Sequence, residues 1–281
     1  MAQEKKRAVL CPNCGRLISS TEKTCPHCGL SKPTSFWKNN PLIRGLSDEA
    51  AVIRAFIVVN AAIYILSLLL YPRGMGMSMN PLNMLSPSSQ SLLVLGATGS
   101  YPIDQFGRWW SLISANFLHG SIVHILFNML AFKQIAPLIV REFGVYRMLI
   151  IFLAGGTFGF LVSYLAGVRL TIGASAAVCA LIGAALYYGR SRGGIYGQAI
   201  FRQIGGWVIG IFLFGLLVPG INNWGHGGGL AGGALLGLMM GYSEKTRENS
   251  AHKTIAMTCV GVTGLTLAYA VITALLIRIS G

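Results

Sequence analysis

Ser175 and His226 are the two residues of this chain whose types and positions best suit acid–base chemistry. Each lies near the start of a different apolar segment, Ser175 within Gly173-Ala-Ser175 and His226 within a glycine-rich run. A serine hydroxyl becomes a nucleophile when a neighbouring imidazole accepts its proton. The aspartates, Asp48 and Asp104, both lie outside the predicted apolar segments. The sequence therefore predicts a Ser-His dyad without a third acid.

Each of these residues also has a purely structural interpretation. Serine in a membrane helix often bonds to its own backbone carbonyl, and a buried histidine can bond to a carbonyl in the same way. For Ser175 taken alone, the structural role is favoured. Ser175 and His226 each lie near the start of an apolar segment, so they would enter a membrane to the same depth. For the two residues taken together, catalysis is the better interpretation.

A second group of polar residues precedes the dyad along the chain. His124 and Asn128 are four residues apart, so on a helix they share one face and can direct two N–H donors at one point. They suit an oxyanion hole. His119 lies five residues before His124 and would point elsewhere on an ideal helix. A metal site of His119, His124 and His226 is disfavoured, because no carboxylate lies within the predicted spans, and we expect no catalytic cofactor.

The composition requires a membrane to house these residues. Of 281 residues, 53% are hydrophobic and 11% are charged, and several apolar segments approach the roughly 20 residues that cross a bilayer. Seven spans are predicted, at residues 52–71, 111–132, 146–167, 172–189, 201–218, 223–242 and 254–277. The fourth span would carry Ser175 about 5 Å from its start, at about 1.5 Å per residue. Glycines 225, 229, 233 and 237 and alanines 176, 180 and 184 form small-residue stripes that would let two of these helices approach closely.

The orientation follows from the basic residues of the short loops. Three loops carry most of them: Lys133, Arg141 and Arg147; Arg190, Arg192 and Arg202; Lys245, Arg247 and Lys253. The opposite side carries Arg73, Arg108, Arg169 and Arg278. By the positive-inside rule the basic loops and the N-terminus are cytoplasmic and the C-terminus is outside. The net charge of +14 then indicates topology and contact with an anionic lipid bilayer, and not nucleic-acid binding.

The N-terminal segment has the spacing of a metal site. Cys11 and Cys14 form one Cys-x-x-Cys knuckle, and Cys25 and Cys28 form a second. Four thiolates in this pattern can bind a structural zinc ion tetrahedrally. Disulfides are the alternative, but a cytoplasmic segment is kept reduced. We expect a zinc-ribbon-like module at residues 1–32 and a linker at 33–50. The basic residues of the module, Lys5, Lys6, Arg7 and Lys23, favour a solvated surface over contact with lipid head groups or a cytoplasmic partner.

Taken together, these motifs resemble the rhomboid family of intramembrane serine proteases. The matching residues are Gly173-Ala-Ser175, His226-x-x-Gly229-x-x-x-Gly233 and His124-x-x-x-Asn128, with Trp109-Trp110 upstream. The resemblance implies an all-α polytopic membrane protein, with a six-helix core at 51–245 and a seventh transmembrane helix at 246–281. It further implies that Ser175 is the nucleophile, His226 the base, and His124, Asn128 and the Ser175 N–H the oxyanion hole. Ala176 and Cys179 depart from the family, which usually has glycine at the first position and often an aromatic residue at the second.

The predicted function is hydrolysis of transmembrane substrate proteins near the outer membrane face. A prokaryotic plasma membrane is favoured over an organellar one, because no targeting peptide is apparent. A rhomboid-like pseudoprotease that binds transmembrane helices without cutting them is the alternative. A small-molecule transporter is disfavoured, because the sequence has neither internal repeats nor paired broken helices.

Overall fold

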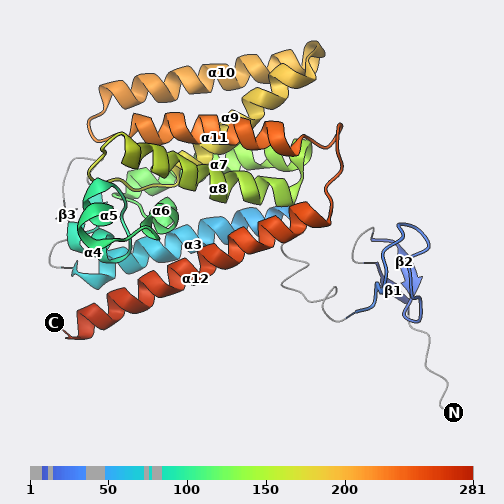
Figure 1. The fold of residues 1–281 in the computed structure, drawn as a ribbon, viewed down its shortest axis with the longest axis horizontal. Coiled ribbons are helices and arrows are strands. Elements are labelled where there is room, and N and C mark those ends of the chain that lie inside the picture. Colours follow the sequence, from blue (N-terminus) through green and yellow to red (C-terminus); the bar gives the residue numbers. More distant parts are fainter. Residues whose placement is uncertain (1–7, 12–14, 36–47, 73–75, 78–83, 281) are drawn as a thin grey trace. The chain divides into compact units, whose positions relative to one another are not determined.

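The computed structural model describes residues 8–11, 15–35, 48–72, 76–77 and 84–280 (Figure 1). Cys14, Arg73 and residues 36–47 of the predicted linker lie outside these ranges. The chain divides into two units, residues 1–54 and residues 55–281.

Long helices dominate the larger unit. The described residues contain seven helices of at least 18 residues: α3 (Glu49–Leu70), α7 (Ile122–Phe143), α8 (Val145–Leu165), α9 (Ser175–Arg192), α10 (Gly194–Leu217), α11 (Asn223–Met240) and α12 (Ser250–Ser280). Five of these are long and apolar enough to cross a membrane, and the other two are α9 and α11. Arg190 and Arg192 lower the hydropathy of α9, and glycines lower that of α11. The chain is a mostly helical, multi-pass membrane protein.

Shorter elements fill the connection between α3 and α7. They are the antiparallel strands β3 (Gly76–Met77) and β4 (Met84–Ser86), the helices α4 (Ser89–Val94), α5 (Ser100–Phe106) and α6 (Ser111–Ser114), and the 3-10 helix η3 (Ala115–Phe117). The backbones of Thr98 and Thr171 pair through two N–H···O bonds of 3.1 and 2.7 Å. This bridge ties the connection to the loop that leads into α9.

The predicted bounds of the second span, 111–132, are wrong. The helix α7 begins at Ile122, because the side chain of Ser121 accepts the backbone N–H of His124 at 3.1 Å and caps the first turn. The helix therefore also reaches further along the chain than predicted, and Lys133 and Arg141 lie inside it.

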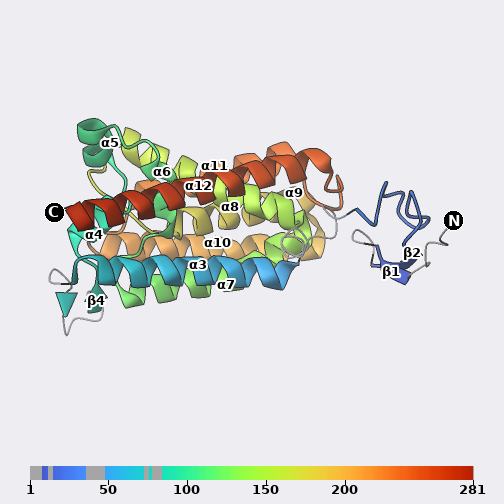
Figure 2. The same ribbon diagram turned by 90° about the horizontal axis from the view of Figure 1, so that it is seen from below.

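The helices α8, α9 and α11 pack against one another and form the centre of the bundle. The helix α10 packs on α9, and α12 packs on α8. Figures 1 and 2 show α8, α10, α11 and α12 running roughly lengthwise in the bundle, with α12 tilted against α11 in Figure 1. Most of α10 is exposed on the surface of the protein, which matches a helix that faces lipid.

Arg147, predicted to lie in a basic loop, is instead a fully buried residue of α8. Its guanidinium donates to the carbonyl oxygens of Gly241, at 3.2 Å, and of Thr246. The carboxylate of Glu248 accepts the backbone N–H of Arg147 at 2.9 Å, which satisfies a free donor at the start of α8. Burial raises the pKa of the Glu248 carboxyl above its ordinary value. The loop after α11 is thereby fixed to the start of α8.

The smaller unit contains a two-stranded antiparallel sheet, β1 (Ala8–Leu10) and β2 (Leu17–Ser19). The paired residues are Ala8 with Ser19, Val9 with Ile18, and Leu10 with Leu17. Its small core consists of Cys11, Ile18 and Cys25, with Val9, Cys28 and Leu30 packed on them. So few apolar side chains are a weak basis for folding without a metal.

Candidate active site

Ser175 is the first residue of α9, and not the third or fourth as the predicted span implied. The first backbone N–H groups of an α-helix have no intrahelical acceptor, and Ala174, the residue before Ser175, provides no side-chain cap for them. Gly173 turns the chain into the helix with φ of +124° and donates its N–H to the Ala115 carbonyl at 2.9 Å. Ser175 is thus presented at an N-terminus that favours negative charge.

His226 lies in the first turn of α11, and its imidazole points to the serine of α9. The Nε2 atom of His226 and the Oγ atom of Ser175 are 2.9 Å apart. His226 is only 7% exposed, and its Nδ1 atom is buried with no hydrogen-bond partner within the described residues. The structure therefore brings the two predicted residues within hydrogen-bonding distance of each other.

The close approach of α9 and α11 depends on residues without bulk. A Cβ atom on Gly229 or Gly233 would collide with the carbonyl oxygen of Ala176 or Ala180, respectively. One turn further, a Cβ on Gly237 would lie 3.6 Å from the Cα of Ala184. The structure thus confirms that these small-residue stripes face each other. Gly225 faces the side chains of Asn222 and Ser163 instead.

His124 lies at the start of α7 and faces the loop before Ser175. Its Nδ1 atom accepts the backbone N–H of Gly120 at 3.2 Å, so in the neutral imidazole the proton is on Nε2. A Cβ on Gly173 would lie 2.7 Å from this Nε2 and 3.6 Å from Ser175 Oγ. An N–H donor therefore points into the space beside the serine, and only glycine leaves that space open.

Asn128 follows His124 by one turn of α7. Its Nδ2 atom donates to the backbone carbonyl of His124 at 2.9 Å, which leaves the second N–H of the amide for another acceptor. His119 precedes α7, and its ring is 5.1 Å from that of His124 in an edge-to-face arrangement. The expectation that His119 points away was wrong, because it assumed that both histidines lie on one helix.

Sequence reasoning missed Asn222, which connects three parts of the site. This residue caps α11: its Oδ1 accepts the N–H of Gly225 at 2.9 Å. Its Nδ2 donates to Ser163 Oγ in α8 at 2.7 Å and to Thr171 Oγ1, before α9, at 2.9 Å. One amide thus joins the start of the histidine helix to the loop that carries the serine. An asparagine four residues before His226 was the available signal, since asparagine is a preferred N-cap.

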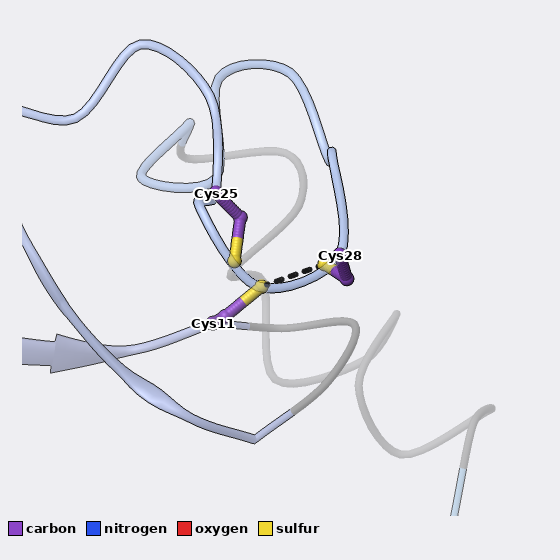
Figure 3. Close-up of side chains that lie close together, drawn as sticks. All are labelled: Cys11, Cys25 and Cys28. Atoms are coloured by element: carbon purple, nitrogen blue, oxygen red, sulfur yellow. Dashed lines mark hydrogen bonds between the residues drawn. The ribbon is translucent and has the colours of Figure 1, made fainter.

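The cysteines of the smaller unit form a separate cluster (Figure 3). The sulfur atoms of Cys11, Cys25 and Cys28 lie within 4.8 Å of one another, and those of Cys11 and Cys28 are 3.7 Å apart. Zn–S bonds of about 2.3 Å in a tetrahedron place sulfur atoms about 3.8 Å apart. Gly15 and Gly29, both with positive φ, close the two knuckles through N–H bonds of 2.9 Å to the carbonyls of Cys11 and Cys25. Three close thiols could therefore hold a metal ion.

Comparison with known proteins gives one family model and several similar relatives. The model of the rhomboid domain matches residues 106–243. The rhomboid protease GluP of Bacillus subtilis is 34% identical over 160 residues, which cover 56% of this chain and 31% of GluP. RHOMBOID-like protein 4 of Arabidopsis thaliana is 35% identical over 163 residues, 57% of this chain and 41% of that protein. The putative rhomboid protease YdcA of Bacillus subtilis is 29% identical over 143 residues, 50% of this chain and 72% of YdcA. The chain therefore aligns with less than half of the first two relatives.

Proposed function

Because the chain belongs to the rhomboid family, we propose that it is an intramembrane serine endopeptidase that cleaves transmembrane proteins. The observation that carries the proposal is the 2.9 Å approach of His226 Nε2 to Ser175 Oγ. A relative named as a rhomboid protease, GluP, supports the same reaction.

The proposed reaction begins when Ser175 Oγ attacks the carbonyl carbon of the scissile peptide. His226 Nε2 accepts the hydroxyl proton and later donates it to the leaving nitrogen. The acyl-enzyme is then hydrolysed by water, which His226 activates in the same way. The imidazole must hold its proton on Nδ1 at the start, and that atom has no acceptor within the described residues.

The oxyanion of the tetrahedral intermediate needs donors that are already in place. We assign this role to His124 Nε2–H, the backbone N–H of Ser175 and the free N–H of Asn128. The hydrogen bond from Gly120 to His124 Nδ1 supports the assignment, because it fixes the donor tautomer. The position of Ser175 at the start of α9 supplies a second donor.

The proposed topology has seven spans, a six-helix core and the additional helix α12. The helices α9 and α11 would cross the membrane at the centre of the core, since α8 packs on both and α10 covers α9. The C-terminal ends of α9 and α11 are remote from the dyad. Basic residues lie at or just beyond these ends: Arg190, Arg192, Lys245 and Arg247. By the positive-inside rule that end is cytoplasmic, and the dyad lies towards the outer face.

A dyad inside the membrane, towards its outer face, would act on transmembrane helices. A transmembrane helix hides its carbonyl groups in hydrogen bonds, so it must unwind before Ser175 can attack one. Residues that weaken a helix, such as glycine and proline, near the outer end of the substrate are the proposed specificity determinant.

The experiment is cleavage of a single-span protein by the chain in proteoliposomes, with fragments identified by mass spectrometry. We expect one cut near the outer end, none with Ser175→Ala or His226→Ala, and much less when the substrate's helix-weakening residues are replaced by leucine. Capture of the substrate by wild-type protein without any cleavage would favour the pseudoprotease instead. Equal cleavage by Ser175→Ala would contradict the assigned nucleophile.

For the smaller unit we propose a structural zinc ion held by Cys11, Cys25 and Cys28, with Cys14 as the fourth ligand. The 3.7 Å spacing of two of the sulfur atoms supports it. Zinc would supply folding energy to a segment with little core, and no step of the proposed reaction depends on it.

A further inference from the structure

A pocket lies where α9 ends and α10 begins, far from the dyad. It has a volume of about 210 Å³ and is lined by Gly189, Arg190, Gly193, Gln198, Phe201 and Arg202. Because α9 rises about 1.5 Å per residue, this pocket is about 20 Å from Ser175 along the helix. It therefore belongs to no part of the site described above.

The two arginines of the pocket are not neutralised within the part of the chain that the structure describes. Arg190 and Arg202 make no ion pair there, and no carboxylate lines the pocket. Nearby arginines differ in this respect: Arg192 pairs with Glu244 at 3.1 Å, and Arg141 pairs with Glu142 at 2.7 Å. Two unpaired guanidinium groups and the amide of Gln198 give the pocket several N–H donors and a net positive charge.

The pocket also borders the apolar surface of α10. Phe201 is 42% exposed, and further along the same helix Ile209, Leu213 and Leu216 are each more than half exposed. Because α10 is apolar enough to cross a membrane, its first turns lie at the boundary between lipid and water. A molecule in this pocket would have an anionic group among the arginines and hydrocarbon along α10.

We propose that this pocket binds the phosphate group of an anionic phospholipid, with the acyl chains lying on α10. Guanidinium groups match phosphate oxygens in geometry and can bind them with paired N–H···O bonds. Basic pockets between membrane helices on the cytoplasmic side are suited to lipid head groups. Phe201, next to Arg202 in α10, gives the pocket an apolar lining residue.

The test measures phospholipid binding to the purified full chain in neutral detergent by native mass spectrometry. Phosphatidylglycerol is titrated against phosphatidylcholine for wild type, Arg190→Gln, Arg202→Gln and the double variant. Arg247→Gln is the control, since Arg247 is an exposed cation at the same end of the bundle and outside the pocket. Size-exclusion profiles check that each variant is folded.

We expect wild type to retain phosphatidylglycerol in preference to phosphatidylcholine. Each pocket substitution should weaken the binding about fivefold, the equivalent of about 1 kcal/mol for a basic side chain near an anionic lipid, and Arg247→Gln should change it little. Equal losses in all three single variants would overturn the proposal, because they would indicate unspecific attraction. Glycerol phosphate or inorganic phosphate that competes as well as the lipid would also overturn it, because the ligand would then be a soluble phosphate.

Discussion

The Nε2 atom of His226 and the Oγ atom of Ser175 lie 2.9 Å apart, although 51 residues separate them in the chain. Two helix starts, Ser175 in α9 and Asn222-capped α11, meet at this point. The contact is possible because glycines of one helix face alanines of the other.

Asn222→Ala should lower the kcat for cleavage on the order of tenfold with little change in KM. The substitution removes the cap of α11 and the bonds to Ser163 and Thr171, and an N-cap contributes about 1 kcal/mol, to which the unsatisfied hydroxyls add. Asn222→Asp should recover most of the rate, since its carboxylate can cap Gly225 and accept from the Thr171 hydroxyl. Kinetics in proteoliposomes measure both variants. Equal kcat in wild type and Asn222→Ala would contradict a positioning role.

Gly233→Ala should separate α9 from α11, because its Cβ would collide with the backbone of Ala180. Overpacking of this kind costs about 1–3 kcal/mol, and we expect a lower Tm together with a loss of activity. Gly227→Ala is the matched control in the same helix, since a Cβ at Gly227 meets nothing within 4 Å. Alanine there should be neutral or stabilise by about 0.5–1 kcal/mol. Thermal unfolding in detergent compares the two, and identical Tm values would be inconsistent with the close packing.

Glu248 should make the stability of the chain depend on pH. Burial raises the pKa of its carboxyl in the folded protein, so the folded state holds this proton more strongly than the unfolded state does. Stability should therefore fall as the pH rises from the ordinary carboxyl pKa through the raised one. Glu248→Gln should flatten this part of the profile, whereas Glu244→Gln, at an exposed carboxylate, should not. Chemical unfolding over a pH series measures the free energy of unfolding of each variant. If its dependence on pH were the same in Glu248→Gln as in wild type, Glu248 would not be the group responsible.

Cys11→Ser and Cys25→Ser should each abolish zinc binding by the smaller unit. A site that loses one of four thiolates binds zinc much more weakly, and this small core has little else to hold it together. Metal analysis of the purified chain measures the zinc content, and Cys179→Ser, in the buried part of α9, should retain it. Full zinc occupancy in both N-terminal variants would show that the cysteine cluster is not the site.

Much of the centre of the fold could be predicted from the sequence. Glycines at 229, 233 and 237 and alanines at 176, 180 and 184 repeat every four residues, so helix geometry alone places each set on one face. The residue types of Ser175 and His226 then indicated which ends of the two helices would meet. In the structure the glycine face of α11 lies against the alanine face of α9, and His226 Nε2 is 2.9 Å from Ser175 Oγ.

The region before α7 could not be predicted in the same way. Hydropathy treats residues 111–132 as one apolar segment, but residues 111–117 form the short helices α6 and η3, where Ser111 and Ser114 bond to residues between α4 and α5. Ser111 Oγ donates to Thr98 Oγ1 at 2.9 Å, and Ser114 Oγ donates to the carbonyl of Gly96 at 2.9 Å. Arg147 and Asn222 were misjudged or missed for the same reason, since their roles depend on carbonyl and hydroxyl partners that only tertiary structure brings near.

The most direct test of the central claim is covalent labelling of the purified chain by a fluorophosphonate, which reacts with activated serines. Wild-type protein in detergent should be labelled at Ser175, identified by peptide mass spectrometry. Labelling should be absent in Ser175→Ala and nearly absent in His226→Ala, because the hydroxyl then lacks its base. Folded wild-type protein that remains unlabelled, or labelling that persists in His226→Ala, would contradict a working Ser175–His226 dyad.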